Sequence, residues 1–423
     1  MCFRDRARIR HISFEKNFLE GGCRETEVTS SLFLLLALFL YVVHNVYSAL
    51  SVYTMLLPSR TDVWIKPSRF NETGRRLAVI VPLYKESSSE IAKTFSSICM
   101  QDYPKGLLRV LVVVEDGDVG TMEAVEENLG LLWASGIRSE LVVKPPPRSC
   151  KASALNFCLK RVEEDMVAIY DGGDEFNDVN QFKAAIELLE EGYSAVGVRV
   201  LRGGKSLLSR FSLVECKLWY DVALPMAVRL TGYPLLSGEG MFLRREFLRV
   251  VGGFKEVLTE DSYMTIMMMA NLGTRAALLE SVILEGAPKG WGALVRQRVR
   301  WYRGYSQCAK DLLRTRIAPK VRLPLLFMYL SPLALIAITL SGMTVLIATL
   351  SFFGLGVEIP LGFLWWSCGT AIATLTVTIY VCTNYSANLL VAILLPVYWM
   401  LLGFVSLYAI LTPRVSWYKT SRV

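Results

Sequence analysis

Two long stretches of this chain carry almost no charged side chains, and they constrain its fold more than any other feature. Residues 32–57 contain no charged residue, and residues 323–413 contain only Glu358. A helix that crosses the hydrocarbon layer of a membrane needs about 20 apolar residues, so both stretches are long enough to span. The mixed sequence between them, about 265 residues, is enough for one large folded domain. The sequence therefore predicts an integral membrane protein and excludes a wholly cytosolic, disordered or disulfide-framed class.

The distribution of charge divides the chain into five segments. They are an N-terminal tail (1–30), a transmembrane helix (31–57), a folded domain (76–290), an amphipathic interfacial helix (291–318) and a C-terminal membrane region (323–412). The last region is expected to hold three helices, at 331–353, 361–383 and 388–411, with a fourth as the alternative. Three spans after an inside domain would leave the C-terminus outside, whereas the basic residues beyond position 413 favour an even number.

Basic residues near the first apolar stretch predict its orientation. Residues 12–30 contain two Lys or Arg, and residues 58–76 contain five. Lys and Arg gather on the cytoplasmic side of spanning helices, which puts the folded domain in the cytoplasm. Four arginines between positions 4 and 10 favour the opposite orientation. The expected location is the cell membrane, as a multi-pass protein in contact with membrane lipids.

The side chains available for chemistry are limited. None of the nine cysteines forms a CxxC pair, so neither a zinc site nor a disulfide framework is expected. The two histidines, His11 and His44, both precede the folded domain. Chemistry in that domain must therefore use carboxylates and bases other than histidine. The net charge of +8 follows the membrane-facing segments and forms no basic-aromatic recognition module, so no nucleic-acid partner is expected.

The folded domain alternates apolar, β-branched runs with helical stretches. Strands are expected at 77–82, 110–114, 140–143, 166–170 and 194–200, with helices that include 89–100 and 151–164. This alternation predicts an α/β sandwich in which ligands bind at the carboxyl ends of the strands.

Acidic residues collect at two of these strand ends. The run 110–114 leads into Glu115 and Asp116, and the run 166–170 leads into Asp171 and Asp174. Such carboxylates can hold a nucleotide's base or ribose, or a divalent cation that bridges phosphates. A single acidic strand end is more commonly a solvated turn, so the pair carries the argument.

Further motifs follow in a characteristic order: Lys151–Asn156, Thr259-Glu260-Asp261 and Gln297-x-x-Arg300-Trp301. With the opening segment Val79–Glu86 and the acidic strand ends, the ordered set resembles the family 2 glycosyltransferases over about residues 76–316. The sequence around Gln297 is most similar to that of the membrane-embedded synthases of cellulose, glucan and chitin oligomers. The resemblance implies a GT-A (Rossmann-like) catalytic domain inserted between transmembrane helices.

The resemblance also implies a donor site and a cation site. A nucleotide sugar, with UDP more expected than GDP, would contact Glu86, Asp116, Lys151, Asp171 and Arg300. A Mg²⁺ or Mn²⁺ ion would bind at Asp171 and Asp174. In the commonest family pattern the second carboxylate stands where this chain has Gly173. We therefore expect Asp174 to be the metal ligand and Asp171 to lie on the nucleotide side.

Catalytic and acceptor residues follow from the same resemblance. Asp261 is expected to be the general base, with Glu260 as the next candidate. The alternative is that Asp261 merely caps a helix over 262–271, where Asp is favoured in any case. Gln297, Trp301 and Glu239 are expected to contact the acceptor. The helix at 293–316 has one apolar face and many basic residues, so it is also expected to dock on anionic lipids.

Three functions are compatible with membrane segments around such a domain. The preferred one is inverting, metal-dependent transfer of a hexose to a growing polysaccharide at the cytoplasmic membrane face. The alternative is a single transfer to a ceramide- or polyprenyl-type lipid, which the small number of spans and the absence of a recognisable gating segment after Trp301 favour. A transporter is disfavoured, because the C-terminal spans contain almost no ionisable residue to mark a pathway.

Overall fold

The computed structural model describes most of the chain and the two ends only in part. It covers residues 35–46, 48–56, 62–66, 74–147, 150–271, 273–355, 359, 361–385, 389–412, 420 and 422. The expected N-terminal tail, residues 1–30, lies outside the described residues.

A mixed eight-stranded sheet forms the centre of the folded domain, in the order β1-β8-β6-β7-β5-β2-β3-β4. The strands are β1 (Trp64–Ile65), β2 (Leu77–Leu83), β3 (Leu108–Glu115), β4 (Arg138–Lys144), β5 (Met166–Ile169), β6 (Ala195–Gly203), β7 (Met241–Arg244) and β8 (Ala276–Gly286). Only β7 pairs antiparallel with its neighbours in this sheet. The carboxyl ends of the other seven therefore meet at one edge, as the α/β prediction requires.

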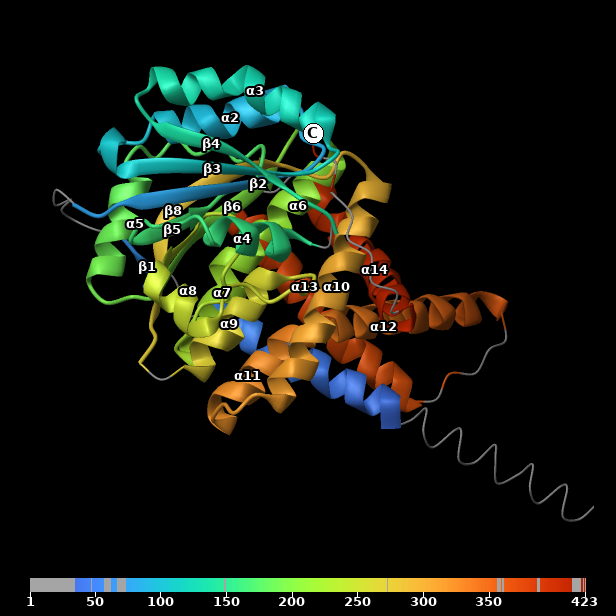
Figure 1. Cartoon of the computed structure of the whole chain (residues 1–423). Helices are drawn as coiled ribbons and strands as arrows, with labels where there is room; N and C mark the ends of the chain where they lie inside the picture. The colour runs from blue at the N-terminus through green and yellow to red at the C-terminus, as the bar shows by residue number, and fades with distance from the viewer. Residues whose placement is uncertain are drawn as a thin grey trace, which may run out of the picture.

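Helices cover both faces of the sheet, because the central strands are buried on both sides (Figure 1). On one face, α2 (Ser88–Cys99), α3 (Val119–Ala134) and α5 (Gln181–Glu190) pack on side chains such as Val79 and Val81. On the other, α4 (Lys151–Leu159), α8 (Arg245–Val251) and α9 (Glu260–Ala270) pack on Ala78 and Ile80. The expected α/β class is confirmed.

The strand order reverses direction between β2 and β5. From β2 the chain adds β3 and β4 on one side and then returns to add β5 on the other. Open α/β sheets leave a crevice at such a point, outside the carboxyl ends of the strands. The segments that follow β2 and β5 carry Glu86 and Asp171, so the topology alone brings these two acidic segments together.

Long apolar helices gather against one side of this domain (Figure 1). They are an N-terminal helix (Leu35–Leu56), α12 (Ser331–Leu350), α13 (Leu361–Tyr385) and α14 (Leu389–Leu411). Each is long and apolar enough to cross a membrane. Between the domain and α12 lie α10 (Trp291–Arg314) and the short α11 (Pro319–Tyr329). Strands β6 and β7 are also linked by a continuous helical segment. It consists of α6 (Leu207–Leu218), residues 219–223 and α7 (Leu224–Thr231).

Small residues let α12 and α14 approach closely. The Thr339 hydroxyl donates to the Met400 carbonyl at 2.8 Å, and the Ser406 hydroxyl donates to the Pro332 carbonyl at 2.8 Å. A Cβ atom on Gly403 would overlap both the Thr339 side chain and the Leu335 backbone. Small residues at a contact are typical of helix pairs in membranes, where close packing replaces the hydrophobic effect.

We therefore expect Gly403→Ala to lower the stability of the helical region by about 1–3 kcal/mol, the usual cost of overpacking. Gly362→Ala in α13 is the matched control, because a Cβ there meets no atom within 4 Å. Thermal unfolding in detergent measures both variants. Equal melting temperatures for the two would contradict the packing described here.

Candidate active site

A cavity of about 430 Å³ connects the carboxyl edge of the sheet with the apolar helices. All but two of the sequence-predicted site residues line it: Glu86, Lys151, Asp171, Glu239, Glu260, Asp261, Gln297, Arg300 and Trp301. Its other end is lined by residues of the apolar helices, including Met55, Ala334, Ile338, Ala373 and Val377. The predicted site and the space between the apolar helices are therefore one continuous cavity.

The Lys151 ammonium group lies at the centre of the charged part of the cavity. Lys151 Nζ is 2.6 Å from Asp171 Oδ1 and 3.9 Å from Glu260 Oε1, and it donates to the Gly238 carbonyl at 2.9 Å. Burial works against the charge on Lys151, but Asp171 and Glu260 outweigh it and raise its pKa. Gly238 permits this geometry, since a Cβ atom there would lie 3.1 Å from Lys151 Nζ.

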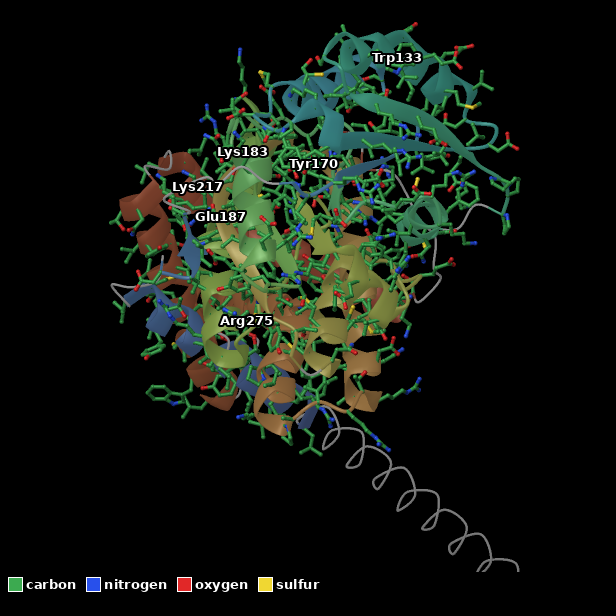
Figure 2. The ribbon with its side chains drawn as sticks, turned by 60° about the vertical axis from the view of Figure 1, so that its left-hand side comes forward. Trp133, Tyr170, Lys183, Glu187, Lys217 and Arg275 are labelled. Carbon is green, nitrogen blue, oxygen red and sulfur yellow. The ribbon has the colours of Figure 1, made fainter. Side chains whose placement is uncertain are left out.

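The strand that presents Asp171 is anchored in the domain interior. Tyr170 is fully buried, its ring stacks on Phe176 at 4.5 Å, and its hydroxyl donates to Gln181. Figure 2 shows Tyr170 within the domain, whereas Trp133 on α3 lies at the outer surface. This anchoring fixes the position at which the chain leaves β5 and enters the site.

Asp174 does not line the cavity and supports the loop that carries Asp171. Its Oδ2 atom accepts the Asp171 N–H at 2.7 Å, and the side chain is fully buried. Burial, together with the charges of Asp171 and Glu285, raises the pKa of Asp174 well above its usual value. Its expected role as a metal ligand stays a prediction.

The carboxylates that lie beside Asp171 are Glu239 and Glu285. Among the described residues, these three offer oxygen atoms within 4.8 Å of one another. Oxygen ligands of this kind suit Mg²⁺ or Mn²⁺, so the residues present fit a divalent cation. Glu239 was expected on the acceptor side, whereas Glu285, at the end of β8, was not predicted.

Two arginines compensate the negative charge of this carboxylate cluster, and neither was predicted. Arg202 on β6 contacts Glu239 at 2.7 Å and also pairs with Glu285. Arg422, near the C-terminus, pairs with Glu285 and donates to the Gly172 carbonyl at 3.1 Å. Burial opposes the charge on Glu239, but Arg202, Lys151 and Arg422 lower its pKa to about 2. Glu239 is therefore ionised at neutral pH.

Glu260 and Asp261 form the first turn of α9. The helix begins at Glu260 with Thr259 as its N-cap, so the alternative that Asp261 caps a helix at 262–271 is wrong. Asp261 Oδ1 accepts the Ser262 N–H at 2.7 Å. Burial raises the pKa of Glu260 to about 7 and also raises the pKa of Asp261. A carboxylate with a raised pKa is a stronger general base.

Trp301 on α10 is held between two guanidinium groups. Its ring centre is 4.2 Å from the Arg298 guanidinium and 5.4 Å from that of Arg202. Arg298 is itself fixed, because it donates to Glu215 on α6 at 2.5 Å, and Glu215 also accepts the Tyr398 hydroxyl of α14 at 2.6 Å. Stacked cations of this kind orient an aromatic ring.

The remaining α10 residues face the α9 start. Arg300 donates to the Leu258 carbonyl at 3.4 Å, and burial lowers its pKa. Gln297 is buried and accepts from Arg298 at 2.7 Å. Gly304 allows the two helices to approach, because a Cβ atom there would lie 2.5 Å from Thr259 Oγ1. The Gln-x-x-Arg-Trp helix thus packs directly against the Thr-Glu-Asp turn.

Glu86 and Asp116 lie at the ends of β2 and β3. Gly172 leaves room for Glu86, because a Cβ atom on Gly172 would be 2.9 Å from Glu86 Cδ. Asp116 is exposed, does not line the cavity and donates its N–H to the Lys144 carbonyl at 2.8 Å. Its contact with a nucleotide stays a prediction.

The fold and the carboxylate-lined edge define a GT-A glycosyltransferase. Residues 75–304, more than half of the chain, match the model of a family described as "Glycosyltransferase like family 2". The chain belongs to this family.

Relatives and solved structures extend this comparison. The chain is 23% identical over 275 residues to a beta-monoglucosyldiacylglycerol synthase of Nostoc sp., matching 62% of this chain and 57% of that protein. It therefore spans little more than half the length of that relative. An N-acetylglucosaminyltransferase of Sinorhizobium fredii is 24% identical over 310 residues, 69% of this chain and 73% of that protein.

One solved structure matches almost the whole chain. It is the mannosyltransferase PcManGT of Pyrobaculum calidifontis in complex with GDP-Man and Mn²⁺, with a TM-score of 0.58 and 20% identity. The match covers 89% of this chain and 96% of that one. At 20% identity, this likeness shows the fold.

We expect Asp261→Asn to lower transfer by about 10²–10⁴-fold while nucleotide binding stays nearly intact, because an amide cannot accept a proton. Transfer by the parent should rise with pH as Asp261 loses its proton. Burial raises the pKa of Asp261, so this rise should occur at a higher pH than for an ordinary Asp. Asp116→Asn should instead weaken nucleotide binding. Initial rates across pH and nucleotide titrations separate the two. An Asp261→Asn rate within a few-fold of the parent would move the base to Glu260.

Proposed function

We propose that this protein transfers a hexose from a nucleotide sugar, with inversion, to a hydroxyl group of a membrane lipid. The observation that carries the proposal is the continuous cavity from Asp261 to the apolar wall formed by residues such as Met55, Ile338 and Val377. An apolar wall between helices suits the acyl or prenyl part of a lipid, with its hydroxyl group at the catalytic residues. The similarity to a glucosyldiacylglycerol synthase supports the same acceptor class.

The charged residues of the cavity suit such a transfer. Asp261 would accept the proton of the acceptor hydroxyl as its oxygen attacks the anomeric carbon. Lys151 and Arg300 would hold the diphosphate, and Trp301 would pack beneath the acceptor. A divalent cation at Asp171, Glu239 and Glu285 would neutralise charge on the leaving diphosphate. We propose a UDP-sugar as donor and a cytoplasmic orientation for the catalytic domain, in line with the basic residues that follow the first span.

Processive polysaccharide synthesis is the second candidate. The sequence around Gln297 and Trp301 resembles that of the polysaccharide synthases and favours this second function. A polymer would need a hydrated path lined by sugar-binding groups. The apolar helices contribute aliphatic residues to the cavity wall, and they also contribute His44, Ser48, Ser51, Ser331, Thr374 and Trp399. The similarity to a glucosyldiacylglycerol synthase makes the lipid acceptor the preferred proposal.

Product analysis tests the proposal. Purified protein is incubated with each labelled UDP- or GDP-sugar and with vesicles that contain diacylglycerol, ceramide or a polyprenol. A single labelled product that partitions into organic solvent is expected. A ladder of water-soluble oligomers would instead identify a polysaccharide synthase.

A variant that fills the apolar end of the cavity sharpens this test. Ala373→Phe should abolish transfer to lipid and leave nucleotide binding intact, because Ala373 lines the cavity far along the chain from every donor residue. Ile372→Phe is the matched control, since its neighbour Ile372 faces outward with 67% of its surface exposed. Equal loss, or no loss, in both variants would contradict a lipid path at this position.

Removal of divalent cations should abolish turnover. Carboxylates that face a diphosphate repel it unless a cation reverses the sign of the field. Chelator is expected to lower transfer by on the order of 10²–10³-fold and to weaken nucleotide binding, with Mg²⁺ or Mn²⁺ restoring both. Binding is followed by calorimetry and transfer by product formation. Full activity in chelator would remove the cation from the mechanism.

A further inference from the structure

The C-terminal Arg422 lies in the carboxylate cluster of the active site. Its guanidinium pairs with Glu285, is 3.8 Å from Asp171 Oδ2 and donates to the Gly172 carbonyl at 3.1 Å. The backbone of Arg422 forms an antiparallel bridge with Pro288, just beyond β8. Thr420 and Arg422 both line the cavity, and only 15% of the Arg422 side chain is exposed. The contact therefore combines backbone pairing with a buried charge pair.

Arg422 uses the oxygen atoms that a cation would need. Asp171 and Glu285 are two of the three carboxylates able to hold a metal ion, and both face its guanidinium. In this cluster, three carboxylates (Asp171, Glu239, Glu285) face three cationic side chains (Lys151, Arg202, Arg422). A divalent ion added to these carboxylates would lie beside the positive charge of Arg422, which opposes its binding.

We propose that Arg422 is a built-in counter-cation of the donor-free site, which the divalent cation and the donor diphosphate displace. The Arg422 guanidinium would then leave the carboxylates when the donor binds, and its return would favour release of the nucleotide. The inference rests on the donor site proposed above. It adds a competitor for that site from within the chain.

Direct measurement of Mn²⁺ binding tests the competition without turnover. The full chain in detergent, free of nucleotide, is titrated with Mn²⁺ while the paramagnetic resonance signal of free Mn²⁺ is recorded. Arg422→Gln is expected to bind Mn²⁺ about tenfold more tightly than the parent, within the usual range of coupling between competing ligands. Arg314→Gln is the matched control, because it removes the same charge from an exposed position at the end of α10. Its affinity should not change.

Two further arms keep the result unambiguous. Arg422→Lys retains the charge and should bind Mn²⁺ with an affinity between those of the parent and Arg422→Gln, which guards against an effect of misfolding. With saturating nucleoside diphosphate, the difference between the parent and Arg422→Gln should disappear, because the nucleotide has already displaced Arg422. In the parent, Mn²⁺ with nucleoside diphosphate should also accelerate removal of the last residues by carboxypeptidase, followed by mass spectrometry.

Three outcomes would overturn the inference. Equal Mn²⁺ affinities of the parent and Arg422→Gln would show that Arg422 does not compete. Weaker binding of Mn²⁺ and nucleotide by Arg422→Gln would make Arg422 a ligand of the donor. No Mn²⁺ binding in any variant would remove both this inference and the metal step of the proposed function, whereas the first two outcomes leave that function standing.

Discussion

The ion pair between Lys151 and Asp171 is the contact on which the rest of the site depends. It joins the start of α4 to the end of β5, and through the Gly238 carbonyl and Glu260 it reaches the segment before β7 and the first turn of α9. Breaking a buried ion pair leaves an uncompensated charge and costs several kcal/mol. The positions proposed for the donor, the cation and the base are therefore linked through one ammonium group.

A second network attaches this edge to the apolar helices. Arg298 links α10 to α6 and α14 through Glu215 and Tyr398, and the same guanidinium stacks on Trp301. The residue expected beneath the acceptor is thus positioned by a helix that is long and apolar enough to span a membrane. In an enzyme with a lipid acceptor, this connection would keep the hydroxyl of a membrane-embedded molecule in register with a base on the soluble domain.

Much of the fold could be predicted from the sequence because central parallel strands are apolar on both faces. The β2 and β3 runs are of this kind. The sequence motifs of the whole domain predicted nine of the residues that line the cavity. Strand β7 has only four residues, and β8 is interrupted by Glu280 and Ser281, so neither gave a strand pattern. Expected helix 151–164 ends at Leu159 in the structure, at the Lys160 C-cap.

The site residues that the sequence did not predict were missed for different reasons. Glu285 stands at the end of an apolar run, the same signal that identified Asp171, and a search for every acidic strand end would have found it. Arg202 follows a predicted strand but has the opposite charge. Arg422 lies far from the catalytic motifs in sequence, and only the folded chain brings it to Glu285. Asp174 differs again, because its backbone contact cannot be seen in a motif.

The return of Arg422 to the catalytic domain has a consequence for how the chain is threaded through the membrane. A polypeptide that leaves one side and comes back to it makes an even number of complete crossings. Three long apolar helices, α12, α13 and α14, separate α10 from Arg422, and α11 has only 11 residues, too few to cross. In a membrane, an even number of crossings would let at most two of these three helices run from one face to the other. An even number is also what the basic residues beyond position 413 favour.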